Sequence, residues 1–385
     1  MLNNIFRLTL LLIAFQAFSA CSTIRPEQNN TNPYPGYSML APTHSKKHPL
    51  LVWNKRRGHL ILLNQDLEPN LRFCLDSIIG FHAFYQYLYL QSDSVLFICA
   101  KKDPQKRLVR LYRFNVHNEA FSVLDTLSKH YFSGYDAQKL VQEQNAEYDS
   151  VKYHVRSAYV SSSNPFHLQR DSTYIFALKP YSRSTYSDIV SVVNLTQNAH
   201  RTLPIKEDRY FINNEDKLPY FAGIVNTEVV DGVVYYSPGF SSTIYSYNMA
   251  TRAHDTIPVP VPGLPDTIPL CSHPEACRGK MGRKTSYYSH LVLNRRGEFV
   301  QLFAKGFDDL ANRDYADIAD SLHQSFAIVY KPGRDRTARV VPVARAGLLF
   351  TYTIGEKAVY WVDERQSAAK GKLVLGRKPY FTTDE

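Results

Sequence analysis

Short apolar segments with alternating polar and apolar residues recur along the chain from residue 50 to its end. Examples are "NTEVVDGVVYYSP" (226–238) and "SHLVLNRRGEFVQLFAK" (289–305). Alternation with a period of two predicts strands that are buried on one face, and the Asp-Gly and Arg-Gly pairs between the runs predict tight turns. The sequence therefore predicts an all-β protein built from consecutive antiparallel hairpins.

Aromatic composition and a recurring asparagine support this interpretation. The chain contains 27 Tyr and 21 Phe but only 2 Trp, a composition that suits pleated, partly buried surfaces. The segments at 111–121, 190–200 and 244–254 each place an asparagine after a strand-like run, at Asn115, Asn194 and Asn248. An asparagine side chain at this place can accept hydrogen bonds from the turn backbone. The sequence thus predicts a repeated strand unit with variable insertions.

The number of hairpins gives an expected architecture. About six hairpin pairs fit a single six-bladed β-propeller, because each blade contains four strands and the radial arrangement leaves few open edges. Two stretches without alternation, residues 136–153 and 307–326, contain good helix formers and are expected to be short helical insertions.

The first residues have the features of an export signal. An apolar run from Leu8 to Phe18 follows a short segment with one positive charge, and small residues precede Cys21. We expect residues 1–20 to be removed, residues 21–47 to form a polar, flexible tether, and residues 48–385 to form the propeller.

The tetrad Phe18-Ser19-Ala20-Cys21 resembles the lipobox of bacterial lipoproteins, which implies an acylated Cys21. An ordinary cleaved signal followed by an incidental cysteine is the alternative. Together, the lipobox, the tether and the Tyr-rich hairpins resemble Bacteroidota lipoproteins of unknown function with a six-bladed, TolB-like propeller. The resemblance implies a lipid-anchored protein of the bacterial cell envelope. The lack of acidic residues after Cys21 favours the periplasm-facing outer membrane over the cell surface.

The charge balance limits the partners. The chain carries 45 Lys and Arg against 35 Asp and Glu, a formal net charge of +10. An exported protein rarely meets nucleic acid, so we expect no nucleic-acid partner and favour anionic lipid or acidic glycans. A merely solvated basic surface is the alternative, and the oligomeric state is left open.

Catalytic signatures are missing from the sequence. It has no G-x-S-x-G, no phosphate-binding glycine loop and no H-E-x-x-H. We therefore predict no catalytic residue, no metal site and no cofactor. Acidic pairs occur in "FDDLANRD" and "FTTDE", but sequence cannot place two carboxylates across a cleft, so glycan or peptide hydrolase or lyase chemistry stays open.

The stretch "CSHPEAC" brings Cys271, His273 and Cys277 together. Its spacing does not match the usual zinc arrangements, and an exported chain meets an oxidising compartment. We therefore expect a Cys271–Cys277 disulfide that contributes about 2 to 3 kcal/mol. Cys74 and Cys99 lie in strand-like runs and are either buried thiols or a second pair.

The segment "GRKTSYYSH" (282–290) follows this loop and provides the candidate ligand contacts Arg283, Tyr287, Tyr288 and His290. Tyr and Arg anchor interfaces well, although a solvated loop leading into a strand is the alternative. We expect a binding or scaffolding module for a glycan, a peptide or an envelope protein. The alternative is a propeller hydrolase or lyase that acts at the channel mouth.

Overall fold

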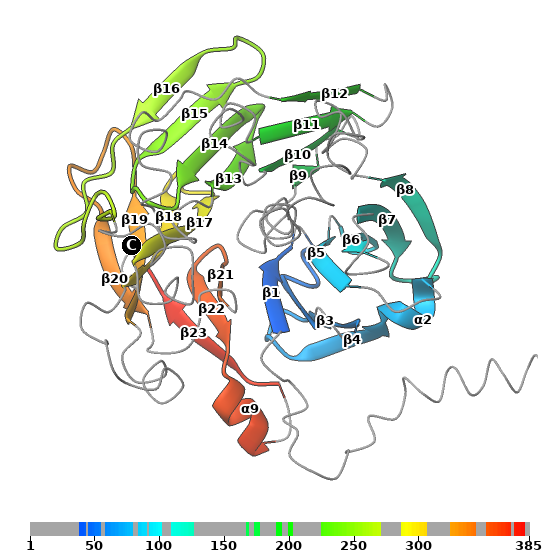
Figure 1. The fold of residues 1–385 in the computed structure, drawn as a ribbon. Helices are drawn as coiled ribbons and strands as arrows, with labels where there is room; N and C mark the ends of the chain where they lie inside the picture. Colours follow the sequence, from blue (N-terminus) through cyan, green and yellow to red (C-terminus); the bar gives the residue numbers. More distant parts are fainter. Residues whose placement is uncertain are drawn as a thin grey trace, which may run out of the picture. The chain divides into compact units, whose positions relative to one another are not determined.

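The computed structural model describes a chain of strands with few helices (Figure 1). The described residues are 38–43, 45–54, 58–79, 84–90, 92–101, 109–126, 167–168, 173–177, 190–194, 199–202, 225–270, 286–305, 324–343, 352–370 and 373–381. The chain divides into two compact units, Met1–Val123 with Val362–Leu375, and Leu124–Trp361 with Gly376–Glu385.

Two four-stranded antiparallel sheets come first along the chain. The first sheet contains β1 (Ser38–Pro42), β2 (Leu50–Asn54), β3 (His59–Leu63) and β4 (Pro69–Cys74) in sequence order. The second contains β5 (Phe84–Leu90), β6 (Val95–Lys101), β7 (Val109–Asn115) and β8 (Phe121–Thr126). The short helix α2 (Leu75–Ile79) follows β4.

Four further sheets follow, and each of them also pairs strands that are consecutive along the chain. One holds β9 (His167–Leu168), β10 (Thr173–Ala177), β11 (Val190–Asn194) and β12 (Ala199–Thr202). The next holds β13 (Val225–Val230), β14 (Val233–Pro238), β15 (Ile244–Asn248) and β16 (His254–Ile257). The third holds β17 (Tyr287–Leu293), β18 (Phe299–Lys305), β19 (Gln324–Tyr330) and β20 (Arg339–Val343). The last holds β21 (Tyr352–Ile354), β22 (Ala358–Val362) and β23 (Leu375–Pro379).

This succession of up-and-down antiparallel sheets confirms the all-β class and is the strand topology of a β-propeller. The predicted count of six four-stranded blades is wrong, because the described residues form five four-stranded blades and one sheet of three strands. The miscount arose in the final hairpin. After β22 the chain enters helix α9 (Glu364–Lys370) and returns with strand β23, so the described residues add one strand, and not a second hairpin, to this sheet.

Turn chemistry explains why the hairpins form where the sequence predicted. Asp231 and Gly232 join β13 to β14 with φ values of 48° and 77°, the left-handed pair that a two-residue hairpin requires. The predicted asparagine caps are confirmed at Asn115 and Asn248. Asn248 Oδ1 accepts hydrogen bonds from the backbone N–H groups of Ala250 and Thr251, both at 3.0 Å, and Asn115 Oδ1 accepts one from His117 at 2.9 Å.

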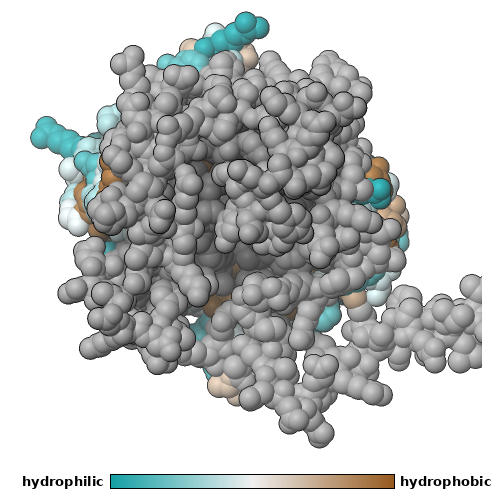
Figure 2. Space-filling model, in the orientation of Figure 1, coloured by the Kyte–Doolittle hydropathy of each residue, from teal (hydrophilic) through white to brown (hydrophobic). Residues whose placement is uncertain are grey.

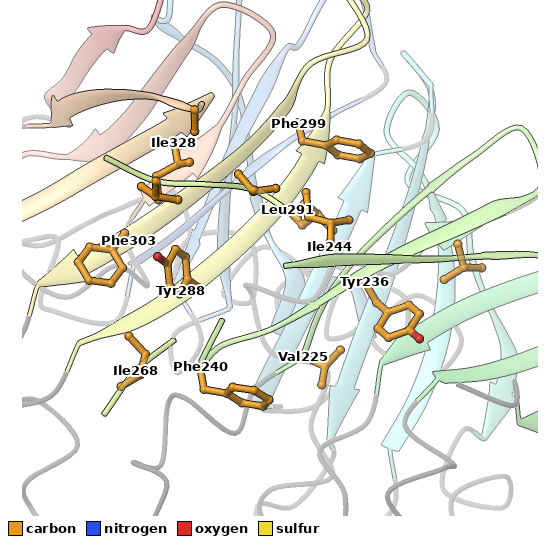
Figure 3. Packing of buried hydrophobic residues seen from close by; sticks show 14 of the residues in the cluster. Val225, Tyr236, Phe240, Ile244, Ile268, Tyr288, Leu291, Phe299, Phe303 and Ile328 are labelled. Carbon is orange, nitrogen blue, oxygen red and sulfur yellow. The ribbon is translucent and has the colours of Figure 1, made fainter. Parts of the chain in front are cut away.

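The second unit has two apolar clusters. One joins the sheet β13–β16 to the sheet β17–β20 and includes Phe240, Tyr288, Phe299 and Phe303 (Figure 3). The other joins β17–β20 to β21–β23 through residues such as Tyr352 and Trp361. Burying one large apolar side chain contributes about 1.5 to 3 kcal/mol, so these contacts hold neighbouring sheets together. A backbone hydrogen bond adds to them, because the Tyr288 N–H on β17 donates to the Gly239 carbonyl after β14 at 2.7 Å.

Two predicted boundaries change. Strand β1 begins at Ser38 and buries Leu40 and Ala41, so sheet structure starts within the expected tether of residues 21–47. The five residues of β1 lie among polar residues and prolines, so the sequence shows no clear strand alternation there. Residues 136–153 and 307–323 lie outside the described residues, whereas residues 324–326, expected to be helical, belong to strand β19.

Hydrophilic side chains project from the described surface in Figure 2, beside smaller hydrophobic areas. Phe121 and Val123, both on β8, are the large apolar side chains exposed among the described residues. Within the same part of the chain, no helix is long and apolar enough to span a membrane.

Candidate functional site

Several predicted site residues lie outside the described residues: Cys21, Cys271, Cys277 and Arg283. Acylation of Cys21 and the Cys271–Cys277 disulfide therefore stay predictions. Cys74, the last residue of β4, is disulfide-bonded, which excludes a free thiol at this position. Its pairing with Cys99 stays a prediction.

The other three candidates, Tyr287, Tyr288 and His290, belong to strand β17 and not to a loop. Tyr287 and Tyr288 are buried in the two apolar clusters, one on each side of the sheet. The Tyr288 hydroxyl donates a hydrogen bond to the Pro265 carbonyl at 2.6 Å, and burial raises the pKa of this hydroxyl well above its usual value. The two tyrosines therefore belong to the core and not to a loop, and their role as ligand contacts stays a prediction.

His290 has an unusual backbone. The register between β17 and β18 shifts between Ser289 and Leu291, so His290 is the extra residue of a β-bulge. Its φ is 56°, a left-handed conformation that is uncommon for residues other than glycine. Such strain costs on the order of 1 kcal/mol or more and persists only where the surrounding structure enforces it.

The surrounding structure holds His290 from both sides. The His290 backbone N–H donates to Asn226 Oδ1 on β13 at 3.0 Å, and the ring Nδ1 lies 3.1 Å from Ser289 Oγ. The ring also forms a hydrogen bond with the backbone of Tyr352 on β21. Strands β13, β17 and β21 are the first strands of three successive sheets. We call Asn226, Glu228, Ser289 and His290 on these strands, together with Gln301 on the adjacent second strand β18, the first-strand polar cluster.

The titratable groups of this cluster are shifted in opposite directions. Burial lowers the pKa of His290 to about 4, against a smaller opposing effect of its hydrogen bond with Tyr352. Burial raises the pKa of Glu228 to about 8, although its carboxylate accepts hydrogen bonds from the Val229 and Leu293 backbone. At neutral pH His290 is neutral and most Glu228 is protonated. The cluster is therefore polar and largely uncharged.

Gln301 adds hydrogen-bonding groups that the described residues do not use. It lies on β18 opposite Leu291, directly beside the bulge, and is 2% exposed. Neither of its amide atoms has a hydrogen-bond partner among the described residues, and the same holds for the buried Ser237 Oγ on β14. Ser237 pairs with Asn226 across β13 and β14. Unsatisfied buried amides are costly, so these groups have hydrogen-bonding capacity that the described residues leave open.

Sequence reasoning identified His290 but missed Asn226, Glu228 and Gln301. Asn226 and Glu228 alternate along β13, which reads as an ordinary solvent-facing side of a strand. Asn226 is instead fully buried. Its amide oxygen accepts a hydrogen bond from the backbone N–H of His290, at the bulge of the neighbouring sheet. No local signal shows that pairing, since the two residues are 64 positions apart.

A second polar group, in the first unit, resembles a Ser-His-Asp set only in composition. The Ser45 hydroxyl donates to Asp93 Oδ1 at 2.5 Å and accepts a hydrogen bond from the His48 backbone N–H at 2.9 Å. Burial lowers the pKa of His48, whereas the Ser45 hydrogen bond lowers that of Asp93. Because the His48 ring does not contact the Ser45 hydroxyl, the group serves to fasten the turn after β1 to the turn after β5.

Among the described residues, no group of three or more His, Cys, Asp or Glu side chains could hold a metal ion. Within the first-strand polar cluster, the two amide atoms of Gln301 are the groups that have no hydrogen-bond partner among the described residues. These groups suit hydrogen bonding to a neutral polar molecule better than cation coordination.

No protein-family model and no curated protein matches this sequence. Solved structures match this chain at low sequence identity. A member of the DUF4221 family from Bacteroides vulgatus is 8% identical, with 89% of this chain and 97% of that chain covered and a TM-score of 0.49. A protein from Bacteroides fragilis is 11% identical, with coverages of 92% and 93% and a TM-score of 0.46. A protein of unknown function from Bacteroides caccae is 8% identical, with coverages of 78% and 80% and a TM-score of 0.38. The assignment to the propeller class rests on the strand pairing of this chain.

Proposed function

We propose that this chain is an exported, lipid-anchored binding module of the cell envelope that binds an uncharged glycan or peptide group at the first-strand polar cluster. Acylation of Cys21, the envelope location and the periplasm-facing orientation belong to the same proposal and are supported by the N-terminal sequence. The ligand class follows from the cluster, which offers donors and acceptors but little charge near neutral pH.

The observation that best supports the proposal is the strained backbone conformation of His290 at the β-bulge. His290 has a strained backbone, is the extra residue of a bulge and is held by the Asn226 side chain of a neighbouring sheet, an arrangement that costs free energy in folding. Bulges commonly re-aim a side chain next to a binding or catalytic site. The unused amide of Gln301 beside the bulge supplies further ligand-binding capacity.

A hydrolase or lyase is the second candidate, favoured by the opposite pKa shifts. A protonated Glu228 and a neutral His290 are the forms that a general acid and a general base need near pH 7. Against this candidate, the Glu228 carboxylate is engaged by two backbone N–H groups. The binding module therefore remains the first proposal.

A glycan and peptide array probed with the purified full-length chain tests the proposal. We expect binding to neutral oligosaccharides or peptides, weakened at least about tenfold by His290→Asn, because a lost hydrogen bond of about 1.4 kcal/mol corresponds to that factor. His254→Asn, an exposed histidine on the edge strand β16, is the matched control and should bind as the parent does.

Equal ligand binding by the parent chain and by His290→Asn would show that the first-strand polar cluster is not the binding site. Time-dependent cleavage of a bound oligosaccharide that Glu228→Gln abolishes would instead favour the enzyme.

A further inference from the structure

The second unit carries a set of basic side chains on neighbouring turns. It is formed by the β17–β18 turn, the β19–β20 turn, the β21–β22 turn and the residues at the end of β23. We call it the basic face; its members are Arg295, Arg296, Lys331, Arg334, Arg336, Arg339, Lys357, Arg377 and Lys378. Seven of the nine are exposed, and Lys331 and Arg339 are partly buried.

Contacts between the turns show that these residues form one surface. The Arg295 backbone N–H donates to Glu356 Oε1 at 2.8 Å, which joins the β17–β18 turn to the β21–β22 turn. The Arg296 and Arg339 guanidinium carbons lie 4.1 and 5.9 Å from the centre of the Phe381 ring. The Tyr380 backbone N–H donates to the Lys357 carbonyl at 3.3 Å. Four segments separate in sequence thus meet at one end of two adjacent sheets.

Basic residues outnumber acidic ones in the described part of this surface. Its turns contain nine basic residues and three carboxylates, Glu298, Asp335 and Glu356, which leaves a net charge of 9 − 3 = +6. Each carboxylate accepts a hydrogen bond within the turn framework. Glu298 Oε2 accepts one from Asn294 Nδ2 at 2.9 Å, and Asp335 Oδ2 accepts one from the Lys331 backbone N–H at 2.7 Å. The whole chain has a net charge of +10, so much of its excess charge is concentrated here.

We propose that the basic face docks on a membrane surface rich in anionic lipid headgroups. A site for one small anion needs buried donors that converge on it, whereas here most of the cations are exposed and spread over several turns. Distributed exposed charge suits a surface that presents many mobile anionic groups. A lipid group on Cys21 would keep the chain near a bilayer, where a basic patch adds a second contact. The proposal does not depend on the first-strand polar cluster.

Vesicle co-sedimentation tests this proposal. The full-length chain is used with Cys21→Ser in every variant, so that acylation cannot hold the protein on the membrane. We expect binding to phosphatidylcholine vesicles that contain about 30% phosphatidylglycerol and little binding to pure phosphatidylcholine, because each basic residue near such a surface contributes roughly fivefold. Raising the salt concentration to about 1 M should release the protein.

Paired substitutions locate the surface. Arg334→Ala with Arg336→Ala should weaken vesicle binding roughly 25-fold, and Lys46→Ala with Lys47→Ala, an exposed pair in the first unit, should leave it unchanged. Equal loss in both pairs, or equal binding to neutral and anionic vesicles, would overturn the proposal. Millimolar inorganic phosphate that displaces the protein, or binding to an acidic polysaccharide without binding to vesicles, would overturn it as well.

Discussion

The first-strand polar cluster and the basic face lie in the same unit and use polar residues in opposite ways. In the cluster, Asn226, His290 and Gln301 are buried and nearly uncharged, and their geometry is fixed by contacts between sheets. On the basic face, Arg296, Arg334 and Lys357 are exposed and charged, and only a few of their contacts are specific.

This difference separates two kinds of recognition. Buried polar groups lose their interactions with water, so each one must be satisfied in a defined geometry, and they discriminate between ligands by shape. Exposed charges act over a longer range and are screened by salt, so they respond to charge density and not to a particular molecule. Mutations in the first-strand polar cluster should therefore change the free energy of unfolding. Mutations on the basic face should instead change association with a charged surface.

The largest effect on stability is expected for Asn226→Ala. It leaves the His290 backbone N–H buried without its acceptor, which costs about 1 to 3 kcal/mol in the free energy of unfolding. Urea denaturation measures this loss. Asn248→Ala, which removes a turn cap that is more exposed to water, should cost less. A larger loss for Asn248→Ala would mean that the bulge is not held by Asn226.

The pH dependence of stability distinguishes the two titratable groups of the cluster. Because the pKa of Glu228 rises from 4.5 unfolded to about 8 folded, its contribution is full below pH 4.5 and is lost as the pH rises to 8. For His290 the pKa falls from 6.5 to about 4, so its contribution is present above pH 6.5 and is lost as the pH falls to 4.

The two effects oppose each other between pH 4.5 and 6.5, and only the Glu228 effect remains between 6.5 and 8. We expect the free energy of unfolding to fall across this upper window by at most about 1.4 kcal/mol per pH unit. Glu228→Gln should flatten the decline when urea denaturation is repeated at each pH. An unchanged slope in the variant would show that Glu228 is charged in the folded protein.

The smallest effect is expected for Arg296→Ala on the basic face. Loss of its contact with the Phe381 ring should cost about 0.5 to 1 kcal/mol, the usual size for an exposed cation–π pair. Arg336→Ala, for which no ring contact is described, should change stability by less than about 0.5 kcal/mol. Identical melting curves for both variants and the parent would show that Arg296 is positioned only by charge.

The repeated part of this fold could be read from the sequence, because strands and turns have local signals. Asp231-Gly232 and the asparagine caps Asn115 and Asn248 mark turns by their own backbone and side-chain chemistry. The final blade could not be counted correctly, since only the pairing of strands shows that its described residues form a sheet of three strands, β21-β22-β23.

The candidate site was predictable only in part. His290 was identified as part of a basic, aromatic stretch, and its neighbours Tyr287 and Tyr288 shared that signal although they belong to the core. The residues that give His290 its geometry, Asn226 and Tyr352, are on other sheets and have no local signature. The geometry of this candidate site depends on contacts between sheets, which residue order does not show.

The central claim is that the buried amide of Gln301 beside the bulge is kept for a ligand and not for stability. The free energy of unfolding of Gln301→Leu tests it most directly. Because both amide atoms of Gln301 are buried without partners among the described residues, an apolar side chain of similar size should raise the free energy of unfolding by about 1 kcal/mol. A decrease of more than about 1 kcal/mol would contradict the claim, since it would show that the amide already stabilises the folded chain.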